Sequence, residues 1–110
     1  MVRVILNLIS WATALTLVAC GVPDAGPRTI ELTVTDPPAA TRRVEVPLGA
    51  EVTLRITAPA DDRVHVHGYE IEQDLMAGVP SDIVFDATMA GTYEVESHVT
   101  DAVWLDLVVK

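Results

Sequence analysis

Hydrophobic and polar residues alternate in short segments from residue 29 onwards. In two of these segments every second residue is apolar, giving the sets Ile30, Leu32 and Val34, and Val52, Leu54 and Ile56. The same period of two recurs in residues 43–46, 63–71, 81–87, 91–99 and 103–109. A period of two is the pattern of a β-strand with one buried face. The segments follow one another at about 8–12-residue intervals, which is typical of a sandwich.

The pattern therefore predicts an all-β, Greek-key β-sandwich of about seven strands over residues 29–110. Prolines and glycines separate the segments, and proline cannot continue the hydrogen-bond ladder of a sheet. Residues 72–78 allow at most a single turn of helix. No longer stretch has a helical period.

The first 28 residues have a different composition. An apolar run follows Arg3 and ends in small residues before Cys20, which is the layout of a secretory signal peptide. The alternative, a membrane-spanning helix, is disfavoured because the run is short and is followed by a proline- and glycine-containing linker. We therefore predict a signal peptide at residues 1–19 and a linker at 20–28.

The sequence "LVAC" at residues 17–20 resembles the lipobox of bacterial lipoproteins. The resemblance implies that the Cys20 thiol is acylated, for example with palmitate, and that the chain is cut before it. Two or more acyl chains give stable membrane anchoring. The predicted location is then the extracytoplasmic side of the cell membrane, held by a lipid anchor. The alternative is a secreted protein with a free thiol, since Cys20 is the only cysteine.

The charge balance narrows the possible partners. The chain carries 7 basic and 16 acidic residues, for a formal charge of −9. Nucleic acid is disfavoured as a partner because a phosphate backbone requires a basic surface. No phosphate-binding loop, catalytic triad or paired-carboxylate motif is present, so an enzyme is not expected.

The candidate chemistry lies in the three histidines, His65, His67 and His98. His65 and His67 are two residues apart in one strand segment, so their side chains share one face and their backbones lie roughly 6–7 Å apart. Two imidazoles at this spacing could chelate one ion. Alternation places His98 away from the core, together with Glu94 and Glu96. We therefore expect the three imidazoles not to converge unless a β-bulge changes the parity of one strand. The alternative is that His65 and His67 are ordinary strand residues.

The stretch "FDATMAGTYEVESHV" at residues 85–99 resembles the region of cupredoxins that leads to their copper-binding cysteine. The stretch "VHVHGYEI" at residues 64–71 resembles the segment with the first copper-binding histidine of that family. The resemblance implies a cupredoxin-like domain of the kind found in bacterial lipoproteins. Ser97 fills the position of the cysteine, and residues 100–109 contain neither histidine nor methionine. A blue-copper site requires a thiolate with two histidines, so the type 1 centre is predicted to be absent.

Two functions follow from these observations. The first is a lipid-anchored binding or accessory module at the cell surface, with an unknown protein partner and no required cofactor. The second is a copper-handling protein that binds or delivers a copper ion through His65 and His67, with help from His98 or a partner. The sequence does not choose between copper and iron pathways.

Overall fold

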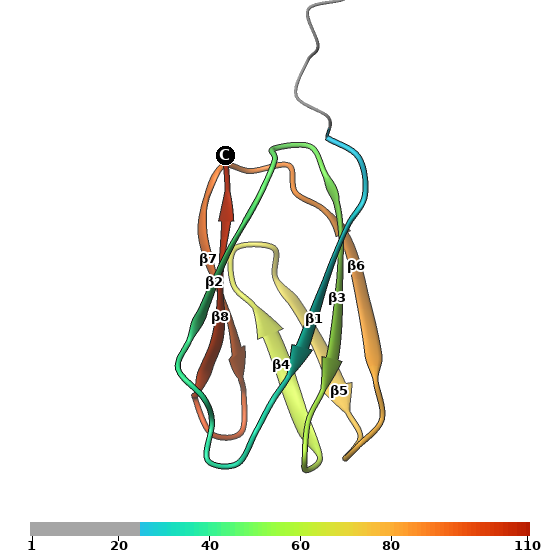
Figure 1. Cartoon of the computed structure of the whole chain (residues 1–110), viewed down its shortest axis with the longest axis vertical. Helices are drawn as coiled ribbons and strands as arrows, with labels where there is room; N and C mark the ends of the chain where they lie inside the picture. Colours follow the sequence, from blue (N-terminus) through green and yellow to red (C-terminus); the bar gives the residue numbers. More distant parts are fainter. Residues whose placement is uncertain (1–24) are drawn as a thin grey trace, which may run out of the picture.

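A computed structural model describes residues 25–110 of the chain, which form eight strands (Figure 1). The strands are β1 (Arg28–Thr33), β2 (Arg42–Val46), β3 (Glu51–Thr57), β4 (Asp62–Val66), β5 (Ile71–Leu75), β6 (Ser81–Asp86), β7 (Gly91–Ser97) and β8 (Val103–Val109). No helix within these residues is long and apolar enough to cross a membrane. The predicted signal peptide and Cys20 lie outside the described residues.

The strands form two sheets, which face each other as a sandwich (Figure 1). The three-stranded sheet has the order β1-β3-β6, and the five-stranded sheet has the order β2-β8-β7-β4-β5. Pairs β1–β3 and β2–β8 are parallel, and the other pairs are antiparallel. The chain crosses between the sheets repeatedly, as in a Greek-key arrangement. The predicted all-β sandwich is confirmed, with eight strands in place of about seven.

The core lies between the sheets and consists of the residues that alternation places inward. Val52, Leu54 and Ile56 of β3 are fully buried, as predicted. Val64 and Val66 of β4 meet them from the opposite sheet. Burial of such side chains contributes roughly 1.5–3 kcal/mol each, so this layer holds the sandwich together.

The segment 63–71, predicted as one strand, is a hairpin. β4 ends at Val66, the chain turns through Gly68 with φ 80° and Glu70 with φ 53°, and β5 begins at Ile71. A Cβ at Gly68 would lie 2.3 Å from the Tyr93 ring, so only glycine fits both the backbone and the space. The turn divides the predicted segment between β4 and β5, which accounts for the eighth strand. The helical turn allowed for residues 72–78 is wrong, because residues 72–75 belong to β5.

Two deviations from strict alternation lie at one end of the β7–β8 pair. Val95 is opposite Leu105 and Glu96 is opposite Val103, so Trp104 is an extra residue in the ladder. This bulge turns both Trp104 and Leu105 into the core. If the alternation of residues 91–99 continued unbroken, Val99 would share the buried face of Val95 and Ser97. It is 68% exposed because β7 ends at Ser97 and the chain turns away.

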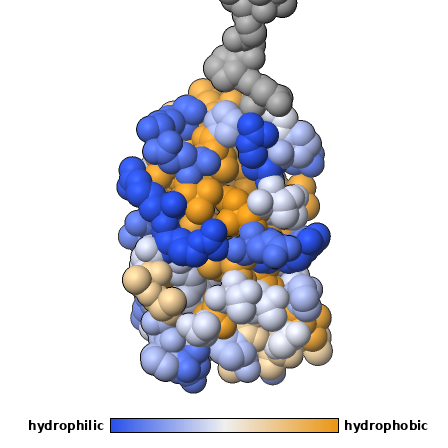
Figure 2. Space-filling model, in the orientation of Figure 1, coloured by the Kyte–Doolittle hydropathy of each residue, from blue (hydrophilic) through white to orange (hydrophobic). Residues whose placement is uncertain are grey.

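The edge formed by β1 and β2 leaves part of the core visible between the sheets. Figure 2 shows apolar residues there, crossed by a band of hydrophilic residues. Part of the connection is a hydrogen bond of 2.6 Å from the Arg42 guanidinium of β2 to the Glu31 carbonyl oxygen of β1. Arg42 thus joins the two sheets where no strand ladder does.

Candidate metal-binding site

The histidine pair lies on the outer face of the five-stranded sheet. Because Val64 and Val66 occupy the inward positions of β4, His65 between them points outward. Strand β4 lies between β7 and β5, and His65 is directly opposite Glu96 on one side and Glu72 on the other. Cross-strand neighbours on one face are the side chains that come into contact in a sheet. His65 is therefore placed between two carboxylates.

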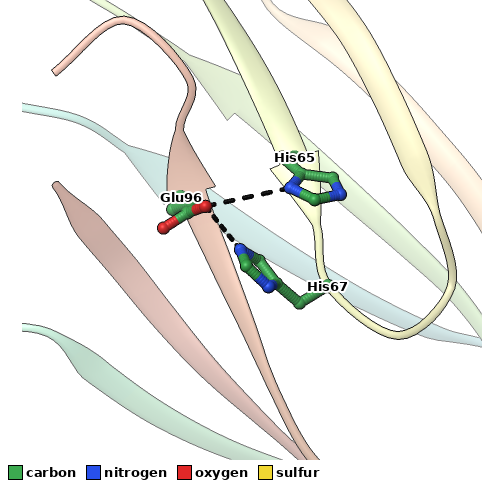
Figure 3. A group of neighbouring side chains, drawn as sticks. All are labelled: His65, His67 and Glu96. Carbon is green, nitrogen blue, oxygen red and sulfur yellow. Dashed lines mark hydrogen bonds and ion pairs between the residues drawn. The ribbon is translucent and has the colours of Figure 1, made fainter. Parts of the chain in front are cut away.

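The first cluster consists of His65, His67 and Glu96 (Figure 3). Their potential ligand atoms all lie within 4.8 Å of one another. The Glu96 carboxylate is 3.8 Å from Nδ1 of His65 and accepts a short hydrogen bond from Nε2 of His67. The side chains of His65 and Glu96 are only 16% and 18% exposed, and that of His67 is 42% exposed. One side of the cluster is thus shielded and the other is open to solvent.

The charges in this cluster support one another. The hydrogen bond from His67 lowers the pKa of Glu96, so the carboxylate is ionised at neutral pH. The same bond raises the pKa of His67, and Glu94 and Glu70 act in the same direction by charge. Both shifts favour the charged pair, in which a His67 imidazolium lies beside the Glu96 carboxylate.

A second cluster shares His65 with the first. His65, Glu72 and His98 also place one ligand atom each within 4.8 Å of one another. The rings of His65 and His98 are 5.8 Å apart and perpendicular, and those of His65 and His67 are 4.4 Å apart. Glu72 and His98 are exposed, so the second cluster is the more open of the two.

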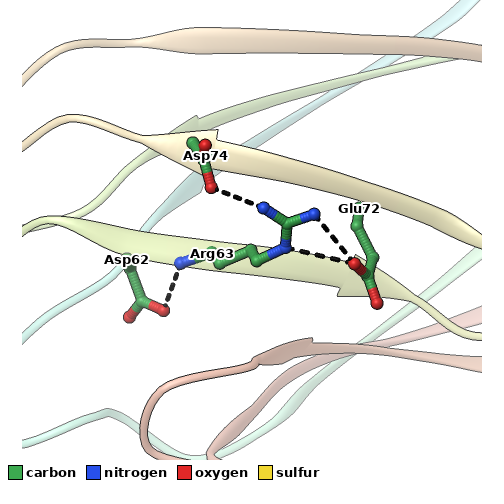
Figure 4. A network of polar contacts seen from close by, with 4 residues as sticks. All are labelled: Asp62, Arg63, Glu72 and Asp74. Carbon is green, nitrogen blue, oxygen red and sulfur yellow. Dashed lines mark hydrogen bonds and ion pairs between the residues drawn. The ribbon is translucent and has the colours of Figure 1, made fainter.

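Arg63 positions the carboxylate of the second cluster (Figure 4). Its guanidinium donates two hydrogen bonds to Oε2 of Glu72, of 2.9 and 3.1 Å, and one of 2.8 Å to Asp74. The pairing lowers the pKa of Glu72. It also engages one carboxylate oxygen and leaves the other available.

The structure places His98 on the outside of the sheet, as predicted, and also places it beside His65. His98 is exposed and faces away from the core, as alternation indicated. The expectation that the three imidazoles do not share one site holds among the described residues, although His65 faces outward too and its ring contacts those of both His67 and His98. His67 and His98 do not form a joint cluster among the described residues, so His65 is the common member.

Glu96 and Glu72 were not identified as candidate ligands from the sequence. Alternation predicts that Glu96 faces outward. The strand order, which sets β5 and β7 on either side of β4, does not follow from alternation. The register that brings both carboxylates opposite His65 is a property of the whole sheet.

Ser97, which fills the copper-cysteine position in the resemblance, is fully buried. Its hydroxyl donates to the Asp62 carboxylate, with oxygen–oxygen distances of 2.8 and 3.0 Å. The same oxygen accepts hydrogen bonds from the backbone N–H groups of Val99 at 3.2 Å and Thr100 at 2.9 Å. The side chain therefore holds the β7–β8 turn in place.

A cavity of about 130 Å³ lies beside this network, between Asp62, Thr100 and Trp104. The described residues that line it include no histidine, cysteine or methionine. This end of the sandwich offers hydroxyl and carboxylate oxygens, which do not match the thiolate and imidazole donors of a blue-copper site.

Comparisons with known proteins bear on the fold. No protein-family model matches the chain, and no curated protein does. Solved structures do match. An NMR structure of a copper binding protein in its apo form has a TM-score of 0.64 at 11% identity, covering 77% of this chain and 89% of that one. A methionine-to-alanine mutant of amicyanin with Cu(I) has a TM-score of 0.52 at 19% identity, covering 74% and 82%.

A chain from a heme-copper terminal oxidase dimer is also similar, with a TM-score of 0.61 at 18% identity. The match covers 79% of this chain and 66% of the oxidase chain. At these identities the likeness concerns the fold alone. The chain has a cupredoxin-like fold.

Proposed function

We propose that this chain is a lipid-anchored, extracytoplasmic cupredoxin-like module that binds a copper ion on the outer face of its five-stranded sheet. The observation that carries the proposal is the first cluster, in which His65, His67 and Glu96 place their ligand atoms within 4.8 Å of one another. Two imidazoles and a carboxylate at this spacing need only small side-chain rotations to meet one ion, because metal–ligand bonds are about 2 Å long.

Copper is the metal that this donor set favours. Imidazole suits copper and zinc, and among the divalent first-row metals Cu²⁺ binds a given nitrogen and oxygen site most tightly. The fold is shared with proteins described as copper binding protein and as amicyanin with Cu(I), which supports the assignment. The ionised Glu96 supplies negative charge that offsets the charge of the ion.

We further propose that the domain has no type 1 copper centre. The Ser97 hydroxyl is already engaged by Asp62 and two backbone N–H groups, and it cannot supply a thiolate. The copper-loaded chain is therefore expected to lack the intense visible band, at about 600 nm, of copper–thiolate sites.

The open side of the cluster fits a binding or delivery role better than catalysis. His67 is 42% exposed, so a protein partner could reach the ion directly. An enzyme would require a substrate site beside the metal, and none of the described cavities includes His65, His67 or Glu96 among its lining residues. We therefore propose a non-enzymatic accessory module that holds copper for exchange with a partner.

The test is a calorimetric Cu²⁺ titration of the full chain purified in detergent, compared with His65→Gln. We expect His65→Gln to weaken binding by more than the roughly 10–100-fold that loss of an outer partner costs at a metal site. Glu51→Gln is the matched control, because Glu51 is an exposed carboxylate on the other sheet and belongs to neither cluster. Equal affinity of wild type and His65→Gln, or a strong band in the visible spectrum, would overturn the assignment.

The anchoring part of the proposal rests on "LVAC" at residues 17–20 and is tested separately. Cys20→Ser removes the thiol that would carry the acyl chains. We expect the variant to leave the membrane fraction or to persist as the longer precursor. A Cys20→Ser protein that is cut to mature size and stays in the membrane fraction would contradict the lipid anchor.

A further inference from the structure

The two clusters on the outer face abut each other, and their arrangement goes beyond a single copper ion. Resting on the proposed function, we propose that this face holds two neighbouring metal ions, with the imidazole of His65 shared between them. His67 and Glu96 would complete one position, and Glu72 and His98 would complete the other. The proposal deepens the first assignment, since one ion alone would leave the second cluster unused.

The register of the sheet makes His65 the shared residue. It is opposite Glu96 of β7 and opposite Glu72 of β5, so each of its two flanks carries a carboxylate. The nitrogen that faces Glu96 is Nδ1, at 3.8 Å. Figure 3 shows the other ring nitrogen on the side away from Glu96. An imidazole ring has two nitrogens that point outward in different directions, so one ring can serve two ions.

The proton balance of the shared ring is simple. A neutral imidazole carries one N–H and one free nitrogen, and the free nitrogen binds the first ion. Binding of the second ion at the remaining nitrogen releases the N–H proton to solvent, because a bound cation makes such a proton more acidic. No electron is transferred, and the ring becomes a negatively charged bridge between the two cations.

The surrounding charges decide whether two cations can lie this close. Two carboxylates, those of Glu96 and Glu72, lie on either side of His65 and supply negative charge to each position. Glu94 and Glu70 act electrostatically on the same region. Against these stands Arg63, whose guanidinium is paired with Glu72 and Asp74. The position with Glu72 is therefore expected to bind its ion with lower affinity than the position with Glu96.

The experiment is a Cu²⁺ titration of the full chain in detergent, followed by metal analysis and electron paramagnetic resonance. We expect two equivalents per chain. The resonance signal should grow with the first equivalent and fall with the second, because the two unpaired electrons couple through the shared ring. His98→Gln should bind one equivalent with an undiminished signal. Glu51→Gln, the matched control on the three-stranded sheet, should still bind two.

The outcomes separate this inference from the proposed function. One equivalent in both wild type and His98→Gln would overturn the second position and leave the first intact. Two equivalents with simply additive signals would overturn the sharing of His65. Absence of binding in the wild type would overturn the proposed function and this inference with it. His65→Gln should lose both ions, and retention of two would also overturn the bridge.

Discussion

Glu96 and Ser97 are neighbours in β7, but their side chains lie on opposite faces of the five-stranded sheet and in opposite environments. Ser97 points inward, is fully buried, and has its hydroxyl occupied by Asp62 and two backbone N–H groups. Glu96 points outward and lies between the nitrogens of two histidines. In the resemblance to cupredoxins, Ser97 fills the position of the copper-binding cysteine. The potential metal-ligand atoms of the structure lie instead around Glu96.

The difference shows how a polar group's partners indicate its role. A buried hydroxyl with a full set of internal partners stabilises its turn and has no lone pair left for an ion. An imidazole that donates a proton to a carboxylate at the surface can release that proton, and a metal ion can then bind both groups. On this criterion the inward face of β7 at Ser97 is structural, and the outward face at Glu96 carries the proposed copper site.

The largest effect that would test this comparison is on stability. Ser97→Ala removes a donor to the Asp62 carboxylate and the acceptor of the Val99 and Thr100 N–H groups, so we expect a loss of about 1–3 kcal/mol. Copper affinity should not change, because the outer face is untouched. Urea unfolding of the metal-free chain and calorimetry with Cu²⁺ measure the two quantities.

Thr92→Ala in the same strand is the control, since Thr92 is exposed, and it should lie within about 0.5 kcal/mol of wild type. A stable Ser97→Ala variant with altered copper binding would reverse the roles assigned to the two faces.

A smaller effect concerns the pH dependence of the metal-free chain. The pKa of His67 is raised by Glu96, so its stabilising contribution is present below the unfolded value of about 6.5 and is lost as the pH rises through the folded value. The pKa of Glu96 is lowered, so its contribution is lost only as the pH falls through the lowered value. Stability from this pair should therefore be greatest in mildly acidic solution.

Unfolding of wild type and His67→Gln at several pH values measures the contribution. The difference between them should be largest between the two pKa values and should shrink toward alkaline pH and with added salt, because both groups are near the surface. A difference that grows with increasing pH would contradict the His67–Glu96 pairing.

Much of the fold could be predicted from the sequence because one periodicity dominates it. Ile30, Leu32, Val52, Leu54 and Ile56 are buried as alternation requires. The deviations arise where the chain leaves the ladder. Gly68 turns a predicted strand into a hairpin, and the bulge at Trp104 buries two consecutive residues. Neither the turn at Gly68 nor the bulge at Trp104 can be recognised from the two-residue alternation of apolar and polar positions.

The candidate site could be predicted only in part. His65 and His67 are close in sequence, so their pairing follows from strand geometry alone. The roles of Glu72, Glu96 and His98 depend on β5, β4 and β7 being adjacent, which involves residues up to about thirty positions apart. Local patterns give the face on which a side chain lies, and they do not give its neighbour across the sheet.

The two ends of the described chain lie at one end of the sandwich (Figure 1). The backbone of Lys110 exchanges hydrogen bonds of 3.2 Å with Val46 and Leu48, which ties the C-terminus to the loop after β2. The histidine face runs along the side of the molecule. An electrode, bead or fluorescent protein attached at Ala25 or Lys110 would therefore leave that face, with its proposed copper site, free for a surface-mounted sensor.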